Sequence, residues 1–325
     1  MAIVISGNGI DMGNNPVSNA SQIDGVVINE NNENNENVAT TSNLVGFKNY
    51  IINGGFDIWQ RDTSFSGSSE YTADRWKAQI NGDVGTKNRS TNVPNGYKYS
   101  LNLSMTGSAS FTQIGQHIEF VNFKGLRGKT ATLSFWVKAN NTNISAATYR
   151  IRYSTNIEDE TILFSGSTLV SGSKTVSTTW QQHTASFVVP TGTTSMTVEF
   201  STGAVSNGDI FYITGVQLEE GSVATPFEQR PIGLELSLCH RYYRPGIELT
   251  YIGNTTVGWQ YGTTINPPTP MRTTPTATFM TNRDLTAFQQ PTVVLLDASR
   301  IGISGVATTT GGGSYASLYS VSAEL

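Results

Sequence analysis

Short runs of alternating apolar and polar residues recur along most of this sequence, and they constrain the fold more than any other feature. The alternation is clearest at residues 99–105 and returns at residues 133–137, 149–153 and 196–200. A period of two gives each run one buried face and one wet face, as in a β-strand packed on one side. Turn signals such as Pro94-Asn95-Gly96 separate the runs. The pattern predicts an all-β chain built around a jelly-roll β-sandwich.

The last run of this region contains a slip in its phase. Phe211 and Ile213 share one phase of the alternation, whereas Val216 and Leu218 share the other. A slip of one residue would turn every later side chain to the opposite face. A bulge next to Gly215 would restore the register, because glycine tolerates the backbone of a bulge.

One amphipathic helix is predicted directly after this strand. Pro231 suits the first turn of a helix, where its missing N–H has no partner in any case. Leu234, Leu238 and Tyr242 then recur at intervals of four and predict the apolar face. Pro245-Gly246 is expected to end the helix.

The N-terminal region differs from the rest in composition. Residues 30–37 read ENNENNEN, a polar tract that cannot bury a core. Apolar residues at positions 3–5 and 26–28 are too numerous for a plain linker. A disordered tail and an anchor that orders on a partner both remain open, and we favour the anchor.

The C-terminal region predicts a second β unit of about eighty residues. Six strands are expected there, interrupted by a proline-rich stretch at residues 266–270 and by a flexible turn at Gly311-Gly312-Gly313. A unit of this size has a thin core. We therefore expect it to pack on the sandwich or on copies of itself.

The expected organisation has four parts. They are an extended N-terminal anchor at residues 1–45, a jelly-roll sandwich at 46–230, a connecting helix at 231–245 and a small C-terminal β domain at 246–325.

Composition excludes several classes of function. Charged residues make up 14% of the 325, and the net charge of −4 offers no basic surface for nucleic acid. The single cysteine, Cys239, excludes an internal disulfide and a cysteine-based metal cluster. No apolar stretch is long enough for membrane insertion, and the first residues lack the pattern of an export signal.

Two segments of the sequence carry a family resemblance. NYIINGGFDIWQRDTSF at residues 49–65, followed by YTADRW at 71–76, is similar to the first segment of sugar-binding jelly-roll modules in bacteriophage tail fibres and related virion appendages. VQLEEGSVATPFEQRPIGLELSLCHRYY, at residues 216–243, resembles their last segment. Together they frame about 180 residues, a little over half of the chain. The region after them resembles, more loosely, the C-terminal portion of phage appendage proteins.

The resemblance implies an oligomeric state, a homotrimer, and a metal. The low charge and the lack of an export signal suit a protein that is assembled onto a virion in the bacterial cytoplasm and released by lysis, and residues 1–45 are expected to contact other virion proteins. No cofactor is expected except a structural calcium ion near the first strand. Asp57 matches the acid that contributes there, but Thr214-Gly215 stands where further acids are expected.

The motifs of the common enzyme classes are absent from the sequence. His117, His183 and His240 fall in different predicted elements, without the spacing of a Ser-His-Asp site. Carboxylates that might cleave a glycosidic bond occur at Asp57, Asp74, 158–160 and 219–220, and we read them as structural or surface acids.

One cluster is a candidate carbohydrate-binding site. Trp59, Gln60 and Arg61 lie close in sequence to Asp74 and Trp76, with Arg75 between the last two. Sugar sites combine an aromatic platform with a few planar hydrogen-bonding groups. A buried Trp76 with Arg75 at the rim is an equally good reading. Further candidates are Trp136, Trp180 and Trp259.

The sequence therefore predicts a non-enzymatic structural virion protein, a tail fibre or appendage that presents a carbohydrate-binding surface to host-cell glycans. One alternative is a capsid-decorating or tail-adaptor protein without a ligand. A polysaccharide depolymerase is the other.

Overall fold

The computed structural model describes residues 4–6, 9–11 and 47–324, and the chain divides into two units at Lys48 and Asn49. In the first unit, β1 (Val4–Ser6) pairs antiparallel with β2 (Gly9–Asp11), with Ile5 opposite Ile10. The rest of the predicted anchor lies outside the described residues.

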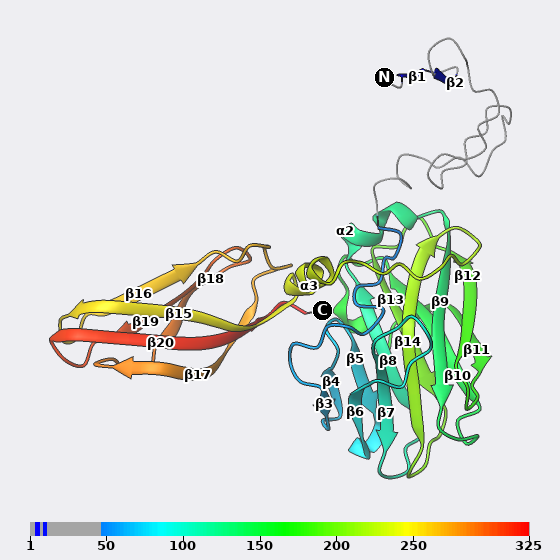
Figure 1. Ribbon diagram of the computed structural model, residues 1–325, viewed down its shortest axis with the longest axis horizontal. Helices are drawn as coiled ribbons and strands as arrows, with labels where there is room; N and C mark the ends of the chain where they lie inside the picture. Colours follow the sequence, from blue (N-terminus) through cyan, green and yellow to red (C-terminus); the bar gives the residue numbers. More distant parts are fainter. Residues whose placement is uncertain (1–3, 7–8, 12–46, 325) are drawn as a thin grey trace. The chain divides into compact units, whose positions relative to one another are not determined.

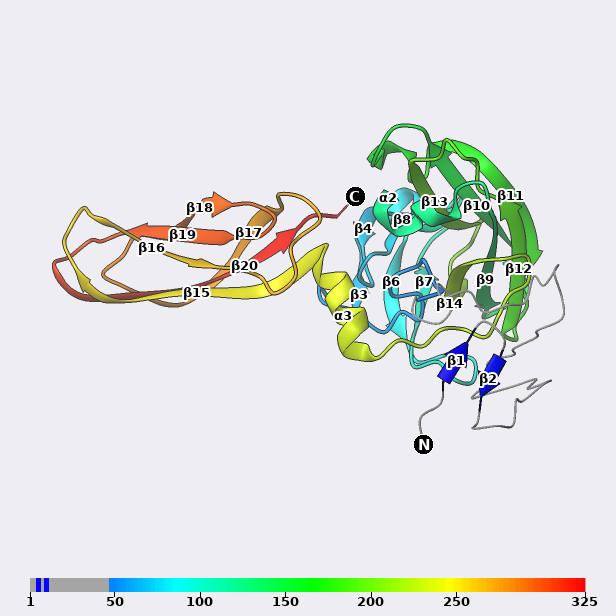
Figure 2. The same ribbon diagram turned by 90° about the horizontal axis from the view of Figure 1, so that it is seen from above.

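The second unit begins with a sandwich of two six-stranded antiparallel sheets, which Figures 1 and 2 show as two facing layers. The first sheet has the spatial order β11 (Ser167–Thr175), β10 (Ala146–Ser154), β13 (Ser195–Thr202), β8 (Thr112–Ile118), β5 (Lys77–Ile80) and β4 (Ser69–Tyr71). The second has the order β12 (Gln181–Val188), β9 (Thr130–Ala139), β14 (Ile210–Glu220), β7 (Ser100–Met105), β6 (Gly85–Ser90) and β3 (Ser64–Phe65). The predicted all-β sandwich is confirmed.

The core of the sandwich fills the space between these sheets. Its side chains are the apolar members of the alternating runs, including Leu101, Leu133 and Val198, all without exposed surface. The rings of Phe135 and Phe200, one from each sheet, lie 4.7 Å apart. Burying each such side chain contributes about 1.5–3 kcal/mol, so the alternation itself specifies which face of each sheet turns inward.

The predicted bulge in β14 is confirmed. The pairing of β14 with β9 shifts register between Thr214 and Gln217, and Gly215 has a φ of 62°. Glycine is needed there for a second reason, because a Cβ would lie 2.6 Å from the hydroxyl of Tyr97. The bulge keeps Ile213 and Val216 in the same core despite their opposite phases.

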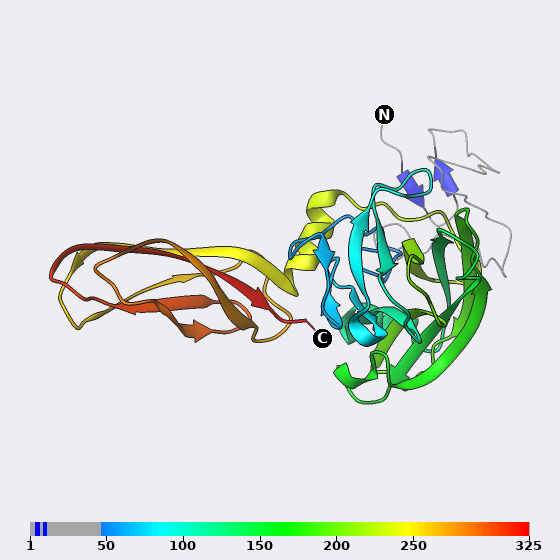
Figure 3. The ribbon, with the colours of Figure 1, turned by 90° about the horizontal axis from the view of Figure 1, so that it is seen from below.

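The connecting helix is shorter than predicted. Helix α3 spans Ile232–His240, between the sandwich and the long strand β15 (Tyr243–Thr255), as Figure 3 shows. The prediction that Pro245-Gly246 ends it is wrong, because these residues form a bulge inside β15, where Gly246 has a φ of 61°.

The predicted apolar face of this helix is confirmed only in part, because Tyr242 is fully buried and Leu238 packs partly buried against the cluster that contains Cys239. Glu235 and Cys239 are its buried residues, whereas Leu234 and Leu238 keep partial exposure. Glu235 is drawn inward by an ion pair of 3.2 Å with Arg230. The other helical segments within residues 47–324 are α2 (Phe120–Phe123) and the 3₁₀ turns η1 (Asn81–Asp83), η2 (Lys124–Leu126) and η3 (Glu160–Ile162).

Residues after the helix form two three-stranded antiparallel sheets. One has the order β15, β20 (Gly311–Ser322) and β17 (Thr276–Thr286), and the other β16 (Gln260–Ile265), β19 (Ile301–Val306) and β18 (Thr292–Leu296). All six strands were predicted. The flexible turn at Gly311-Gly312-Gly313 was not found, because these glycines pair with Thr255, Asn254 and Gly253 in β15.

Buried charges join this region to the sandwich. Arg75, which is 1% exposed, pairs with the carboxylate of Glu324 and stacks on the ring of Tyr242 at 3.5 Å. Glu119 of the sandwich accepts hydrogen bonds from Arg241 and, at 2.7 Å, from the hydroxyl of Tyr242. None of the described helices has the length and apolarity that a bilayer-spanning helix requires.

Candidate functional site

The structure places Trp76, one of the predicted sugar-binding residues, in the core. Its ring has no exposed surface, stacks on Phe56 at 4.9 Å and donates a hydrogen bond of 2.9 Å to the carbonyl of Asn53. An enclosed ring has no face to offer a sugar. The prediction of a platform at Trp76 is therefore corrected to the structural reading.

Three of the other predicted residues, Gln60, Arg61 and Asp74, lie close together, but their polar groups contact one another. Asp74 is 1% exposed and accepts hydrogen bonds from the backbone and side-chain amides of Gln60. Burial raises the pKa of Asp74, and these hydrogen bonds offset part of the effect. Arg61 lies 3.9 Å from Asp74 and bonds Glu324 at 3.2 Å. These groups hold the end of the chain against the sandwich.

Trp59, the remaining member of the cluster, packs against the same core as Trp76. It is half-buried and donates a 2.6 Å hydrogen bond to the carbonyl of Phe56. Trp259, a weaker candidate, is 66% exposed between β15 and β16. No aromatic platform with free polar neighbours forms at the predicted cluster.

Aromatic and polar side chains are combined instead on the outer side of the second sheet. Tyr212 of β14 stands between Lys138 of β9 and Asn102 of β7, and Asn102 stands opposite Asn88 of β6. The Asn88 amide donates a 3.0 Å hydrogen bond to Asn102. In the neighbouring row, half-buried Trp136 stands opposite exposed Gln182.

A loop residue, Asn92, links Lys138 to a second tryptophan, Trp180. Its amide oxygen accepts hydrogen bonds of 3.2 Å from both Trp180 and Lys138. The rings of Trp180 and Tyr212 then meet edge to face, with centroids 6.2 Å apart. Trp180 is half-buried and therefore keeps part of its ring open to solvent.

Two further rings extend this surface beyond the sheet. Tyr97 is linked to Trp136 by a hydrogen bond that partly offsets the rise of the Tyr97 pKa caused by burial. Phe227, from the segment after β14, lies 5.2 Å from the Tyr97 ring. We call the resulting surface the aromatic face, and it consists of Trp136, Trp180, Tyr97 and Phe227 together with Tyr212, which is 8% exposed.

The sequence alone could not identify these residues as better candidates for sugar binding than the cluster around Trp59 and Trp76. Trp136 sits between Phe135 and Val137, so three successive apolar residues leave its orientation open. Pairing in the sheet decides it, because Phe135 and Val137 are both fully buried. Tyr212 and Phe227 carried no signal that separated them from core aromatics.

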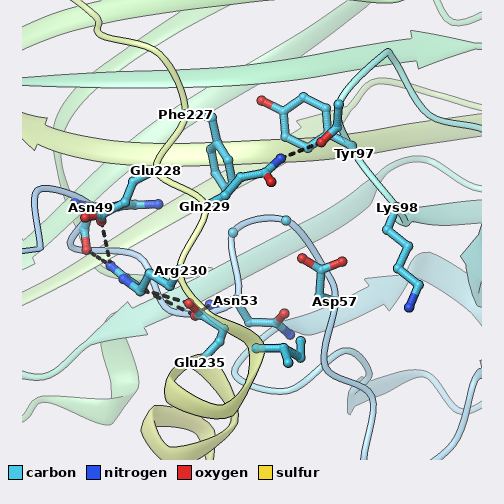
Figure 4. Close-up of a pocket in the computed structure, with 14 residues that line it drawn as sticks. Asn49, Asn53, Asp57, Tyr97, Lys98, Phe227, Glu228, Gln229, Arg230 and Glu235 are labelled. Carbon is cyan, nitrogen blue, oxygen red and sulfur yellow. Dashed lines mark hydrogen bonds and ion pairs between the residues drawn. The ribbon is translucent and has the colours of Figure 1, made fainter.

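A cavity of about 310 Å³ adjoins the face at Tyr97 and Phe227. Figure 4 shows it between the turn at residues 96–98, the segment 227–230 and the loop that carries Asn53 and Asp57. At its base Arg230 donates a hydrogen bond of 3.1 Å to the carbonyl of Ile51 and bonds the carbonyl of Asn49.

The residues around Asp57 do not fit the calcium ion that the resemblance implies. Calcium requires six to eight oxygen ligands, and no group of three or more His, Cys, Asp or Glu side chains suited to a metal occurs in the described part of the chain. The nearby acids Glu228 and Glu235 pair with the guanidinium of Arg230, which is 4% exposed. Thr214 uses its hydroxyl to bond the carbonyl of Tyr99 at 2.8 Å.

No protein-family model matches this sequence, and neither does any curated protein. Among solved structures, the enzymatically active domain of tailspike protein 4 from bacteriophage CBA120 shares 20% identity over 53% of this chain, with a TM-score of 0.38. The match spans 21% of the tailspike chain, about a fifth of its length. The module TmCBM61, solved with β-1,4-galactotriose, shares 14% identity over 54% of this chain and 100% of its own, with a TM-score of 0.37. The C-terminal family 22 carbohydrate-binding module of Clostridium thermocellum Xyn10B shares 15% over 48% of this chain and 91% of its own, with a TM-score of 0.34. Likeness of this degree does not extend to function.

Proposed function

We propose that this chain is a non-enzymatic glycan-binding protein and that its ligand lies along the aromatic face. The observation that carries the proposal is the combination on one sheet of partly exposed Trp136 and Trp180 with the amides of Asn102 and Gln182 and the ammonium of Lys138. Sugars present an apolar ring face and a hydroxyl rim, and this surface offers a complement to each.

The extended shape of the face suits a chain of sugars better than a single one. Trp136 and Tyr212 come from the adjacent strands β9 and β14, and Trp180, Tyr97 and Phe227 come from segments outside the strands, so successive positions can contact successive sugar residues. Each contact is weak, and the affinity of one face is expected to be modest. Several copies on one particle would raise the overall affinity by multivalency.

The carboxylates around the face support binding without cleavage. Glycoside hydrolysis uses two carboxyl groups that flank the scissile bond. Glu219, on the outer side of β14, is 2% exposed and accepts hydrogen bonds of 2.8 and 2.6 Å from Thr225. Within the cavity, Glu228 and Glu235 are paired with Arg230, which leaves Asp57 as a single acid.

We further propose that the protein is a tail fibre or appendage of a bacteriophage particle and works as a homotrimer in host attachment. The resemblance of residues 49–76 and 216–243 to phage appendage modules supports this part. Light scattering on the purified chain is expected to give the mass of three copies, and a monomer at micromolar concentration would exclude the trimer.

Binding itself is tested by applying the full chain to an array of bacterial surface polysaccharides. The proposal expects retention on at least one polysaccharide, without release of reducing sugars. Reducing-sugar release would favour a depolymerase. Absence of binding to every polysaccharide would favour an adaptor without a ligand, especially if the chain is located inside the particle.

A further inference from the structure

The cavity beside the aromatic face has the features of a second binding site. We infer that it holds the terminal residue of the glycan, a neutral sugar with two adjacent hydroxyl groups that donate to the carboxylate of Asp57. The inference rests on the proposed function, because the terminal residue is taken to belong to the chain that lies along the face.

The first observation is a carboxylate that receives no hydrogen bond from the described residues. Asp57 is half-buried, and none of the described residues donates a hydrogen bond to its carboxylate, which has no dashed line in Figure 4. A carboxylate that is partly removed from water and lacks a donor gains from a ligand that supplies one. Burial raises the pKa of Asp57, in keeping with this surrounding.

The other polar side chains at the base of the cavity are already engaged. The Asn53 amide donates to the carbonyls of Ile58 and Asp74, at 2.9 and 3.0 Å. Asn49 accepts from the backbone amide of Ile51 at 2.9 Å and donates to the carbonyl of Val216 at 3.2 Å.

The ion pairs of Arg230 occupy the remaining acids, Glu228 and Glu235. Asp57 is thus the acid of the cavity that remains for a ligand.

The second observation is the aromatic wall. Phe227 and Tyr97 line the cavity and also belong to the aromatic face, so one glycan can run from the sheet into the cavity. Gly55 keeps the space between this wall and the acid open. A Cβ at Gly55 would lie 2.9 Å from the Asp57 carboxylate and 3.7 Å from the ring of Phe227.

The volume and the net charge of the cavity restrict the kind of ligand that it can hold. A volume of about 310 Å³ is at the small end for ligand sites, which favours one sugar residue over several. Three acids (Asp57, Glu228, Glu235) and two cations (Lys98, Arg230) line the cavity, a net charge of −1. Anionic sugars are therefore disfavoured. A carboxylate accepts two hydroxyl donors at once, which adjacent hydroxyl groups provide.

Saturation-transfer NMR on the full chain tests the inference with the methyl glycosides of glucose, galactose and mannose, and with glucosamine as a cationic probe. At least one neutral glycoside is expected to receive saturation. Asp57→Asn should raise its Kd at least about tenfold through loss of a charge-assisted bond. Gly55→Ala, which fills the space but keeps the acid, should have the same effect. Asp83→Asn is the matched control, since Asp83 is exposed at the other end of β6 from the cavity.

The possible outcomes distinguish failure of the cavity site from failure of the proposed role of the aromatic face. The inference is overturned if no neutral glycoside binds, if glucosamine alone binds, or if Asp57→Asn and Gly55→Ala bind like the parent. If polysaccharide binding is lost in Trp136→Ala but unchanged in both cavity variants, the proposed function stands and the cavity site fails. If the cavity variants alone lose binding, the cavity site stands and the role of the face fails. Thermal unfolding of each variant must match the parent.

Discussion

The pair formed by Arg75 and Glu324 offers a sharp test of how the C-terminal region is held. Arg75 is 1% exposed, and the Glu324 side chain is 5% exposed. Burial alone would lower the pKa of Arg75, but the Glu324 carboxylate outweighs that effect and raises it above the ordinary value. Replacing Glu324 with Gln would leave a buried guanidinium with only the carbonyl of His117, at 2.7 Å, and the Tyr242 ring as partners.

The expected cost of Glu324→Gln is about 3–5 kcal/mol in the free energy of unfolding, because an unpaired buried charge is left behind. Urea denaturation followed by tryptophan fluorescence measures it. The control is Glu220→Gln, which breaks an ion pair of 2.8 Å with Lys129 whose side chains are 48% and 51% exposed. An exposed pair contributes about 0–1 kcal/mol.

A double variant, Arg75→Met with Glu324→Leu, removes both charges at once. It should recover most of the lost stability, since apolar replacement of a buried pair is often neutral or stabilising. If Glu324→Gln unfolds within about 1 kcal/mol of the parent, the pair does not hold the C-terminal region as described.

Two further predictions concern pH and metal. Burial holds the pKa of His117 at about 3, below its ordinary 6.5. The contribution of the neutral imidazole to the free energy of unfolding is therefore complete above pH 6.5 and is lost as the pH falls towards 3. His117→Gln should remove a slope of about 1.4 kcal/mol per pH unit from the stability curve between pH 6 and 4, and an unchanged slope would exclude this origin. The guanidinium of Arg230 binds the acids and carbonyls near Asp57 where the resemblance implied a calcium ion. Removing metal with EDTA should therefore leave the Tm unchanged, whereas Arg230→Ala should lower it. A Tm that falls with EDTA and returns with calcium would contradict this.

The strands were predictable because their signal is local. Each inward side chain is two residues from the next, so burial on one face is written directly in the sequence. The bulge at Gly215 could be predicted for the same reason, as a break in that period. Glycine alone is ambiguous, which is why Gly311-Gly312-Gly313 was taken for a turn although pairing with β15 keeps it in a strand.

The helix and the site depend on partners that are distant in the sequence. Periodicity predicted that Leu238 packs inward, and it does so partly buried, but periodicity could not predict that the ion pair with Arg230 turns Glu235 inward as well. Trp76 and Trp136 each lie among residues that fit either a core or a surface. Contacts with Phe56 and Asn53 bury the first, and the pairing of β9 leaves the second partly exposed.

Affinity electrophoresis of two tryptophan variants tests the central claim most directly. The full chain is run through gels that contain the polysaccharide retained on the array, beside Trp136→Ala, Trp180→Ala and the control Trp259→Ala. Trp259 is 66% exposed and lies outside the sandwich. The control variant Trp259→Ala therefore removes a tryptophan ring without changing the aromatic face. The account predicts that Trp136→Ala and Trp180→Ala each weaken binding by at least about tenfold at unchanged thermal stability, as expected for a ring that contributes 1.4 kcal/mol or more, while Trp259→Ala migrates like the parent. Equal retardation of all four proteins would contradict it.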